Sequence, residues 1–234
     1  MILAIVQARL NSHRFPHKIL ADIEGKSMLV RVVERVQRSS YTDLIAVACP
    51  LSDFPAITEL LRDKSEVMVY GGSPFDVLSR YYNCLKLYIP YWPRASLADC
   101  VVRITSDCPL VDPKVLDDMI QYYWSTGVQY LCNPAFGDGL DIEIISPDTL
   151  RKCHLEAKKP YDREHVTTYI LEHKAIFETL EMGCKYDLSH IDWSVDKPED
   201  LEFVRKVYRE LGENFTLEDI IAKYPEVTRV PAKS

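Results

Sequence analysis

Three cationic side chains follow the first apolar run of the chain. Residues 2–6 carry no polar alternation, which is typical of a strand buried on both faces of a parallel sheet. Arg9, Arg14 and Lys18 come directly after this run. An arginine can bind two phosphate oxygens at once and a lysine acts as a movable point charge, so the mixture suits a polyphosphate. Three cations in one short loop also occur on ordinary solvated surfaces, but the carboxyl end of a central strand is where open α/β sheets bind ligands.

Two aspartates stand next to later elements, and they are candidates for a shared metal ion. Asp107 follows an apolar run over 100–105, and Asp196 precedes a helix that Pro198 is expected to open. If Asp107 lies beside a phosphate site, its charge is costly unless a divalent cation lies between them, and Mg²⁺ is the usual mediator. Each aspartate has a simpler alternative role, because Asp107 could stabilise its own turn and Asp196 could cap the helix.

The remaining pattern predicts the elements that must position these residues. Strand and helix signals alternate over about two-thirds of the chain, which indicates a layered α/β fold. The third helix is expected to begin at Ser73, whose hydroxyl can cap it, and the stretch over 88–99, rich in aromatics and prolines, is expected to be a structured connection. The predicted strands are 2–7, 44–49, 66–70, 100–105, 128–132, 141–146 and 176–181, and the predicted helices are 28–37, 53–63, 73–85, 113–124, 147–156, 162–173 and 198–211.

The bulk properties exclude several classes of protein. The chain of 234 residues has a net charge of −7, which argues against binding nucleic acid or an anionic membrane through a broad basic surface. We expect one domain over 1–234. No stretch is apolar enough to span a bilayer, and no basic leader precedes the first strand. The seven cysteines form no CxxC pair. We therefore expect a cytoplasmic location. Neither GxGxxG nor GxxxxGK[ST] occurs, which disfavours a dinucleotide fold and a P-loop ATPase.

Three segments, taken in order, resemble a known family. The loop AR-x-x-S-x-R-x-P-x-K over 8–18, the segment RITSDCPLVDP over 103–113 and the segment SVDKPEDLEFVR over 194–205 are similar to those of the cytidylyltransferases that activate acidic sugars, which include the CMP-KDO and CMP-sialic acid synthetases. The stretches GGSPFDVLSRYY, GLDIEII and REHVTTYI resemble more specifically the branch typified by the spore coat polysaccharide biosynthesis protein SpsF. Each motif alone is weak, but the ordered set covers about residues 2–211.

This resemblance implies a three-layer α/β/α nucleotide-diphospho-sugar transferase fold, which is Rossmann-like and has a mixed, mostly parallel sheet. It also implies that the protein is a homodimer that uses Mg²⁺ and CTP. Ser73 would contact the ribose or the base, although its capping role is enough to explain it. The implied site residues are Ala8 near the base, Arg9, Ser12, Arg14 and Lys18 on the triphosphate, and Asp107 and Asp196 on the metal, with Arg9, Lys18, Asp107 and Asp196 as the catalytic set.

The chain departs from the family pattern next to these residues. The family usually has a glycine before the loop lysine, where this chain has His17. If that glycine serves a positive φ angle or a close backbone approach, His17 would alter how the loop holds the nucleotide. Ser106 replaces the usual small residue of the T-G/A-D-C-P turn, and the 88–99 connection is a third departure.

Two further clusters are expected to face the acceptor sugar. Asp141 and Glu143 would point to the same side of a strand, after a flexible glycine turn over 137–139, and could bind sugar hydroxyls or assist the metal. The polar face of an edge strand is an equal alternative for this pair. Arg163 and His165 lie near the start of a predicted helix and could meet a carboxylate or hydroxyl, although a single histidine there more often caps or packs.

These residues together predict a nucleotidyltransferase. We expect the anomeric hydroxyl of a nonulosonic or octulosonic acid to attack the α-phosphorus of CTP, so that pyrophosphate leaves and an activated sugar for surface polysaccharide is formed. Segment 135–190 would contribute to the acceptor site and to dimer contacts. Two alternatives stay open: a GT-A glycosyltransferase, for which Asp141-Ile142-Glu143 loosely imitates the DxD metal motif, and a non-catalytic nucleotide-binding protein that retains the fold.

Overall fold

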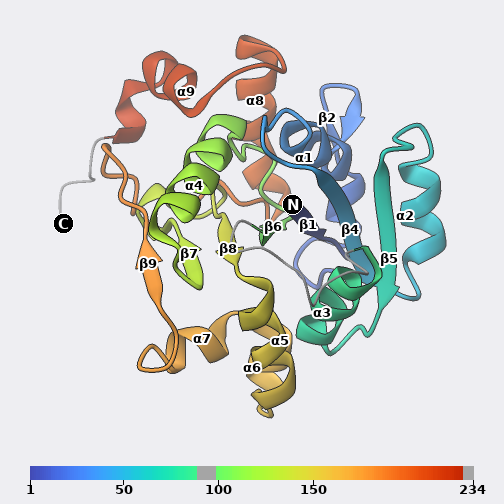
Figure 1. Cartoon of the computed structure of the whole chain (residues 1–234). Helices are drawn as coiled ribbons and strands as arrows, with labels where there is room; N and C mark the ends of the chain where they lie inside the picture. The colour runs from blue at the N-terminus through green and yellow to red at the C-terminus, as the bar shows by residue number, and fades with distance from the viewer. Residues whose placement is uncertain (89–98, 229–234) are drawn as a thin grey trace.

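The computed structural model describes residues 1–88 and 99–228, and a mixed sheet of seven strands forms its centre (Figure 1). The strand order is β5-β4-β1-β6-β8-β7-β9, which confirms the predicted mixed, mostly parallel α/β arrangement. Strands β5, β4, β1 and β6 run parallel, and β8 runs antiparallel to both of its neighbours. Residues 89–98 of the predicted 88–99 connection lie outside the described residues. All the predicted strands are present, as β1 (Ile2–Gln7), β4 (Leu44–Pro50), β5 (Val67–Gly72), β6 (Cys100–Thr105), β7 (Tyr130–Cys132), β8 (Glu143–Ile145) and β9 (Thr179–Glu181).

Helices cover both faces of this sheet. Helices α1, α2, α4, α8 and α9 contribute to the apolar cluster on one face, and α3, α5 and α7 contribute to the cluster on the other (Figure 1). No helix of the described residues is long and apolar enough to cross a membrane. The helices are α1 (Met28–Val36), α2 (Phe54–Leu60), α3 (Val77–Tyr88), α4 (Pro113–Thr126), α5 (Pro147–Glu156), α6 (Pro160–His165), α7 (Thr168–Glu172), α8 (Leu201–Leu211) and α9 (Leu217–Lys223).

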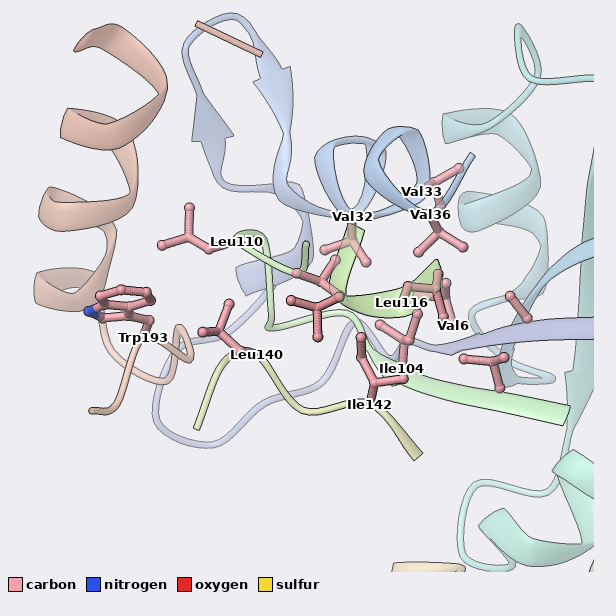
Figure 2. Close-up of a cluster of buried hydrophobic side chains, with 14 of the residues drawn as sticks. Val6, Val32, Val33, Val36, Ile104, Leu110, Leu116, Leu140, Ile142 and Trp193 are labelled. Carbon is pink, nitrogen blue, oxygen red and sulfur yellow. The ribbon is translucent and has the colours of Figure 1, made fainter. Parts of the chain in front are cut away.

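The double covering explains why the first strand is apolar without interruption. Ile2, Ala4 and Val6 enter the core on one face, and Leu3 and Ile5 enter the core on the other. Each of these five side chains is at most 1% exposed. Figure 2 shows part of the first core, in which side chains of β1 and β6 meet those of α1 and α4. The central strands are therefore fixed from both sides, and their carboxyl ends are rigid supports for the loops that follow.

The start of helix α3 differs from its predicted position because of local backbone chemistry. Helix α3 begins at Val77 rather than at Ser73, because the Asp76 carboxylate accepts the N–H of Ser79 at 2.8 Å and caps it. The Ser73 hydroxyl accepts the N–H of Asp76 at 3.0 Å and stabilises the preceding turn instead. The hairpin β2 (Asp22–Ile23) and β3 (Lys26–Ser27) and helix α9 were not predicted.

The predicted helix over 162–173 is divided at Val166. This residue has φ 62° and ψ −55°, and the N–H of Thr167 donates to the carbonyl oxygen of His165 at 2.6 Å, which closes a γ-turn. A β-branched residue at positive φ cannot continue a right-handed helix. Glu164 and His165 therefore end α6 and do not lie in the interior of a longer helix.

A glycine turn packs directly against the segment that leads to Asp196. The N–H of Trp193 donates to the carbonyl oxygen of Asp138 at 2.8 Å. Gly139 has φ 91°, and a Cβ placed there would lie 2.4 Å from the backbone carbonyl carbon of Trp193. The glycines of 137–139 therefore allow close backbone packing, which differs from the flexible approach to the acceptor that the sequence suggested.

We expect Gly139→Ala to lower the free energy of unfolding by about 3 kcal/mol, since the added methyl group combines a disfavoured φ angle with overlap on neighbouring backbone. Gly127→Ala is the matched control, because Gly127 has φ 66° but no atom within 4 Å of an added Cβ. The control should lose about 1 kcal/mol, the conformational cost alone. Urea unfolding of both variants measures the difference, and equal losses would contradict the close packing described here.

Candidate active site

Parallel pairing of β1 with β6 places two loops side by side at one edge of the sheet. Gln7 and Thr105 are paired at the carboxyl ends of the two strands, and the N–H of Ser106 donates to the carbonyl oxygen of Gln7 at 3.0 Å. The cationic loop over 8–18 leaves β1 here, and Asp107 leaves β6 here. This is the edge at which parallel sheets bind ligands.

The ammonium group of Lys18 joins three segments that are far apart in the sequence. Its Nζ donates to Asp107 Oδ2 at 2.8 Å, to Asp196 Oδ1 at 3.0 Å and to the carbonyl oxygen of Val195 at 2.9 Å. These contacts use all three N–H donors of the group. Lys18 is only 8% exposed, so its charge is largely removed from water and depends on the two carboxylates.

In the same cluster, the positive charges of Lys18 and Arg14 lie next to the carboxylates of two aspartates. Burial alone would raise the pKa of Asp107, but the charge and hydrogen bond of Lys18, helped by Thr105, outweigh burial and hold that pKa below its ordinary value. Arg14 Nη2 donates to Asp196 Oδ2 at 2.6 Å from a side chain that is 63% exposed. An ion pair that open to water contributes little stability, so Arg14 is free to exchange this partner for a phosphate.

The side chain of Asp196 is not used as a helix cap. The carboxylate of Asp200 accepts the N–H of Asp196 and that of the next residue, each at 2.7 Å. The N–H of Val195 donates to the carbonyl oxygen of Asp107 at 2.9 Å, which ties the segment before α8 to the turn after β6. The backbone is thus fixed by other groups, and the Asp196 carboxylate faces the cations of the loop.

The donor set at this cluster fits a magnesium ion. Asp107 and Asp196 contact one ammonium nitrogen, so their oxygens face a common point. Within the described residues, no group of three or more histidine, cysteine and acidic side chains could hold a metal ion. Mg²⁺ is commonly held by one or two carboxylates together with substrate phosphates and water, so two convergent carboxylates are an adequate protein contribution.

His17 has the backbone conformation that a glycine would adopt readily at this position, with φ 58° and ψ 25°. Its N–H donates to the carbonyl oxygen of Leu10 at 3.0 Å, which closes the loop just before Lys18. The carboxylate of Asp53 accepts the N–H of Leu10 at 2.8 Å and ties the loop to the end of β4. Histidine tolerates positive φ better than branched residues do, so the loop reaches Lys18 without a glycine.

These loops line a cavity of about 440 Å³. An adjoining cavity of about 710 Å³ shares Arg9, His13 and Glu164 with it and extends toward the end of β4 and the turn before α3. Most of the site residues that the sequence suggested lie on the first cavity, namely Ala8, Arg9, Ser12, Arg14, Lys18, Asp107, His165 and Asp196.

Ser73 and Arg163 lie outside the first cavity. Arg163 donates from Nε and Nη2 to the two carboxylate oxygens of Asp76, at 2.9 and 2.6 Å, and lines the adjoining cavity. Ser73 holds its own turn and lines neither cavity. The structure therefore joins Arg163 to the cap of α3, and a nucleotide role for Ser73 stays a prediction.

The two acidic residues expected at the acceptor also lie outside both cavity linings. Glu143 forms an ion pair with Arg103 and accepts a hydrogen bond from the hydroxyl of Tyr130. Asp141 Oδ2 accepts the N–H of Gly139 at 3.0 Å, just before β8. Burial, with smaller contributions from neighbouring carboxylates, raises the pKa of Asp141 to about 6. The acceptor roles of this pair stay predictions.

Sequence reasoning missed three polar residues on the cavity wall. Gln7 Oε1, Arg80 Nε, Arg80 Nη1 and Arg103 Nε are buried without a hydrogen-bond partner, and all belong to residues that line the first cavity. Buried polar atoms without partners are rare, and each calls for an explanation such as a bound ligand. Arg80 could have been found from its spacing, because it interrupts the buried face of α3 formed by Val77 and Tyr81.

Comparison with known proteins identifies related sequences and structures. A family model described as "Cytidylyltransferase" matches residues 3–218. The spore coat polysaccharide biosynthesis protein SpsF of Bacillus subtilis is 29% identical over 219 residues, which cover 91% of this chain and 88% of that protein. A cytidylyltransferase from Leptospira borgpetersenii has a similar structure, with a TM-score of 0.86, 28% identity and coverage of 100% of this chain and 98% of that one. CMP:2-keto-3-deoxy-manno-octonic acid synthetase complexed with CTP shares the fold, with a TM-score of 0.65, 18% identity and coverage of 90% and 99%.

We expect Asp141→Asn to gain stability relative to the unmodified protein as the pH rises. The folded-state pKa of about 6 lies above the ordinary value of an aspartate, so the stability that this group contributes is present below that ordinary value and is lost as the pH rises through 6. Asparagine keeps an acceptor for the Gly139 N–H but does not ionise. Urea unfolding at pH 5 and pH 7.5 should show a relative gain of about 1 kcal/mol for the variant. A difference that does not change with pH would contradict the raised pKa.

Proposed function

The chain belongs to the cytidylyltransferase family, and we propose that it transfers CMP from CTP to an acidic sugar of the nonulosonic or octulosonic type, with release of pyrophosphate. The observation that carries this proposal is the convergence of Lys18, Asp107 and Asp196 beside the cationic loop. Likeness to SpsF supports a role in surface polysaccharide biosynthesis, and the CTP complex of a protein with the same fold supports CTP as the nucleotide. The proposal includes a cytoplasmic homodimer, which rests on likeness to related synthetases.

In the proposed reaction the anomeric hydroxyl oxygen forms a bond to the α-phosphorus of CTP. The bond from this phosphorus to the oxygen that bridges it to the β-phosphorus breaks, pyrophosphate leaves, and the proton of the hydroxyl passes to water. No covalent intermediate with the protein is needed, so catalysis consists of positioning and of stabilising negative charge on the phosphates. Arg9, Ser12 and Arg14 would contact the triphosphate from the loop, and Ala8, which lines the same cavity, would lie near the base.

Asp107 and Asp196 would hold Mg²⁺, which would supply positive charge against the triphosphate. Lys18 keeps these carboxylates directed at one point before substrate binds. His165 lies at the end of α6 on the same cavity, where its side chain can meet a hydroxyl or carboxylate of the acceptor. The site thus has a phosphate side, formed by the loop, and an acceptor side, formed by α6.

A GT-A glycosyltransferase is less well supported than nucleotidyl transfer. Its metal motif would have to be Asp141-Ile142-Glu143, but Glu143 is already paired with Arg103 and neither acidic residue lines the cavity. The aspartate pair on Lys18 comes instead from two separate segments. A non-catalytic nucleotide-binding protein is the other alternative, and activity alone separates it from the proposed enzyme.

A pyrophosphate-release screen tests the proposed function. It crosses the four nucleoside triphosphates with a panel of nonulosonic and octulosonic acids in the presence of Mg²⁺. We expect release only with CTP and one class of acid. CTP binding in calorimetry without turnover on any acid would indicate a non-catalytic protein, and consumption of a preformed nucleotide sugar would indicate a glycosyltransferase.

We expect Asp107→Asn to reduce pyrophosphate release by at least about 100-fold, because it removes one of two carboxylates available to the metal. Asp118→Asn is the matched control, since Asp118 forms an exposed ion pair with Lys114 on α4, away from the cavity. The control should keep the unmodified rate. Full activity of Asp107→Asn would overturn the metal assignment.

A further inference from the structure

Arg80 is a buried arginine for which two guanidinium nitrogens have no hydrogen-bond partner among the described residues. It lies in α3 and is 2% exposed, and its Nε and Nη1 make no hydrogen bond. Space for its side chain depends on Gly72, where an added Cβ would lie 3.1 Å from Arg80 Cγ. Arg80 and Arg9 are both among the residues that line the first cavity.

Another buried arginine shows what a structural role looks like in this fold. Arg35 is 1% exposed, and its Nε and Nη2 donate to the carbonyl oxygens of Val111 at 2.5 Å and Phe215 at 3.0 Å. Its guanidinium also lies 3.8 Å from the centre of the Phe215 ring. Arg35 therefore joins three parts of the chain, whereas Arg80 is equally buried and joins none through its guanidinium.

Among the described residues, no carboxylate forms an ion pair with Arg80. Asp53 contributes to its electrostatic surroundings, but one Asp53 oxygen accepts the N–H of Leu10 at 2.8 Å and the other accepts the hydroxyl of Ser52 at 2.8 Å. Glu164 also lines the cavity, but it is exposed, and no described hydrogen bond or ion pair joins it to Arg80. A buried charge without a direct ion-pair partner is costly, so the site favours an anion from outside the protein.

The charges of the cavity show which cations are available. Arg14 and Lys18 are matched by the two aspartates of the site, and Arg103 is matched by its ion pair with Glu143. Arg9 and Arg80 lie on the same cavity, and neither forms an ion pair within the described residues. Arg9 and Arg80 are therefore cations of this cavity that have no ion-pair partner among the described residues. They lie at the side of the cavity nearer β4 and β5.

We propose that Arg80 is a substrate-binding residue that, with Arg9, binds a phosphate group in the cavity. The fork of N–H donors on Arg80 suits two oxygens of one phosphate. That this phosphate belongs to CTP rests on the proposed function, whereas binding of the anion itself does not. On this proposal, the guanidinium of Arg80 stays without an ion-pair partner until the phosphate group binds.

The test compares Arg80→Met and Arg80→Lys with Arg62→Met, a control at an arginine that is 67% exposed and lies outside this cavity. Isothermal titration calorimetry with inorganic tripolyphosphate measures anion binding, and urea unfolding measures stability. We expect Arg80→Met to weaken tripolyphosphate binding by at least about 10-fold while its urea midpoint stays equal or rises, because an unpaired buried charge has been removed. Arg80→Lys should be intermediate in affinity, and Arg62→Met should be unchanged.

Unaltered tripolyphosphate binding by both Arg80 variants would overturn the inference. So would a large fall in the urea midpoint of Arg80→Met with no loss of affinity in Arg80→Lys, since that pattern marks a structural arginine. A variant that binds tripolyphosphate normally but loses affinity for KDO, used as a probe of sugar carboxylates, would assign Arg80 to the acceptor and would also overturn it. If Arg80-dependent tripolyphosphate binding is found without pyrophosphate release from CTP, the proposed reaction fails and the inference stands.

Discussion

The candidate site depends on one buried ammonium group. Lys18 Nζ contacts Asp107, Asp196 and the carbonyl oxygen of Val195, so a loop near the start of the chain, the turn after β6 and the segment before α8 meet at one nitrogen atom. Without it, two carboxylates would face each other in a partly buried space and repel. The ammonium group therefore holds in place the two carboxylates that are proposed to bind a divalent cation.

Other contacts of the fold bring these groups to Lys18. Asp53 fixes the cationic loop from the β4 side, and Asp200 fixes the backbone at Asp196. The Gly139 turn packs on the segment just before that aspartate, where any Cβ would intrude. None of these residues needs to contact substrate. Their hydrogen bonds and packing fix the backbone next to the cationic loop and Asp196. The charged side chains of the candidate site are therefore oriented before any ligand binds.

The sequence predicts the outline of this arrangement and misses parts of it for identifiable reasons. Apolar runs that end in charged residues predict the strands and place Arg9 and Asp107 at one edge, because the carboxyl ends of parallel strands lie at the same edge of a sheet. His17 has the positive φ angle that would explain why related proteins usually have a glycine at this position. In contrast, neither the γ-turn at Val166 nor the pairing of Glu143 with Arg103 is encoded in local spacing. The spacing of α3 could have predicted that Arg80 is buried, but not that Nε and Nη1 lack partners, because that depends on what every neighbouring side chain contacts.

The most direct test of the central role of Lys18 is the stability of Lys18→Met with and without Mg²⁺. If Lys18 holds two carboxylates that can accept a divalent cation, the variant should lose about 2 kcal/mol of unfolding free energy in EDTA, because Asp107 loses its ion pair and Asp196 keeps only its exposed pair with Arg14. Saturating Mg²⁺ should then restore much of this loss, while the unmodified protein should respond little. A variant that is as stable as the unmodified protein in EDTA, or that gains nothing from Mg²⁺, would contradict this account.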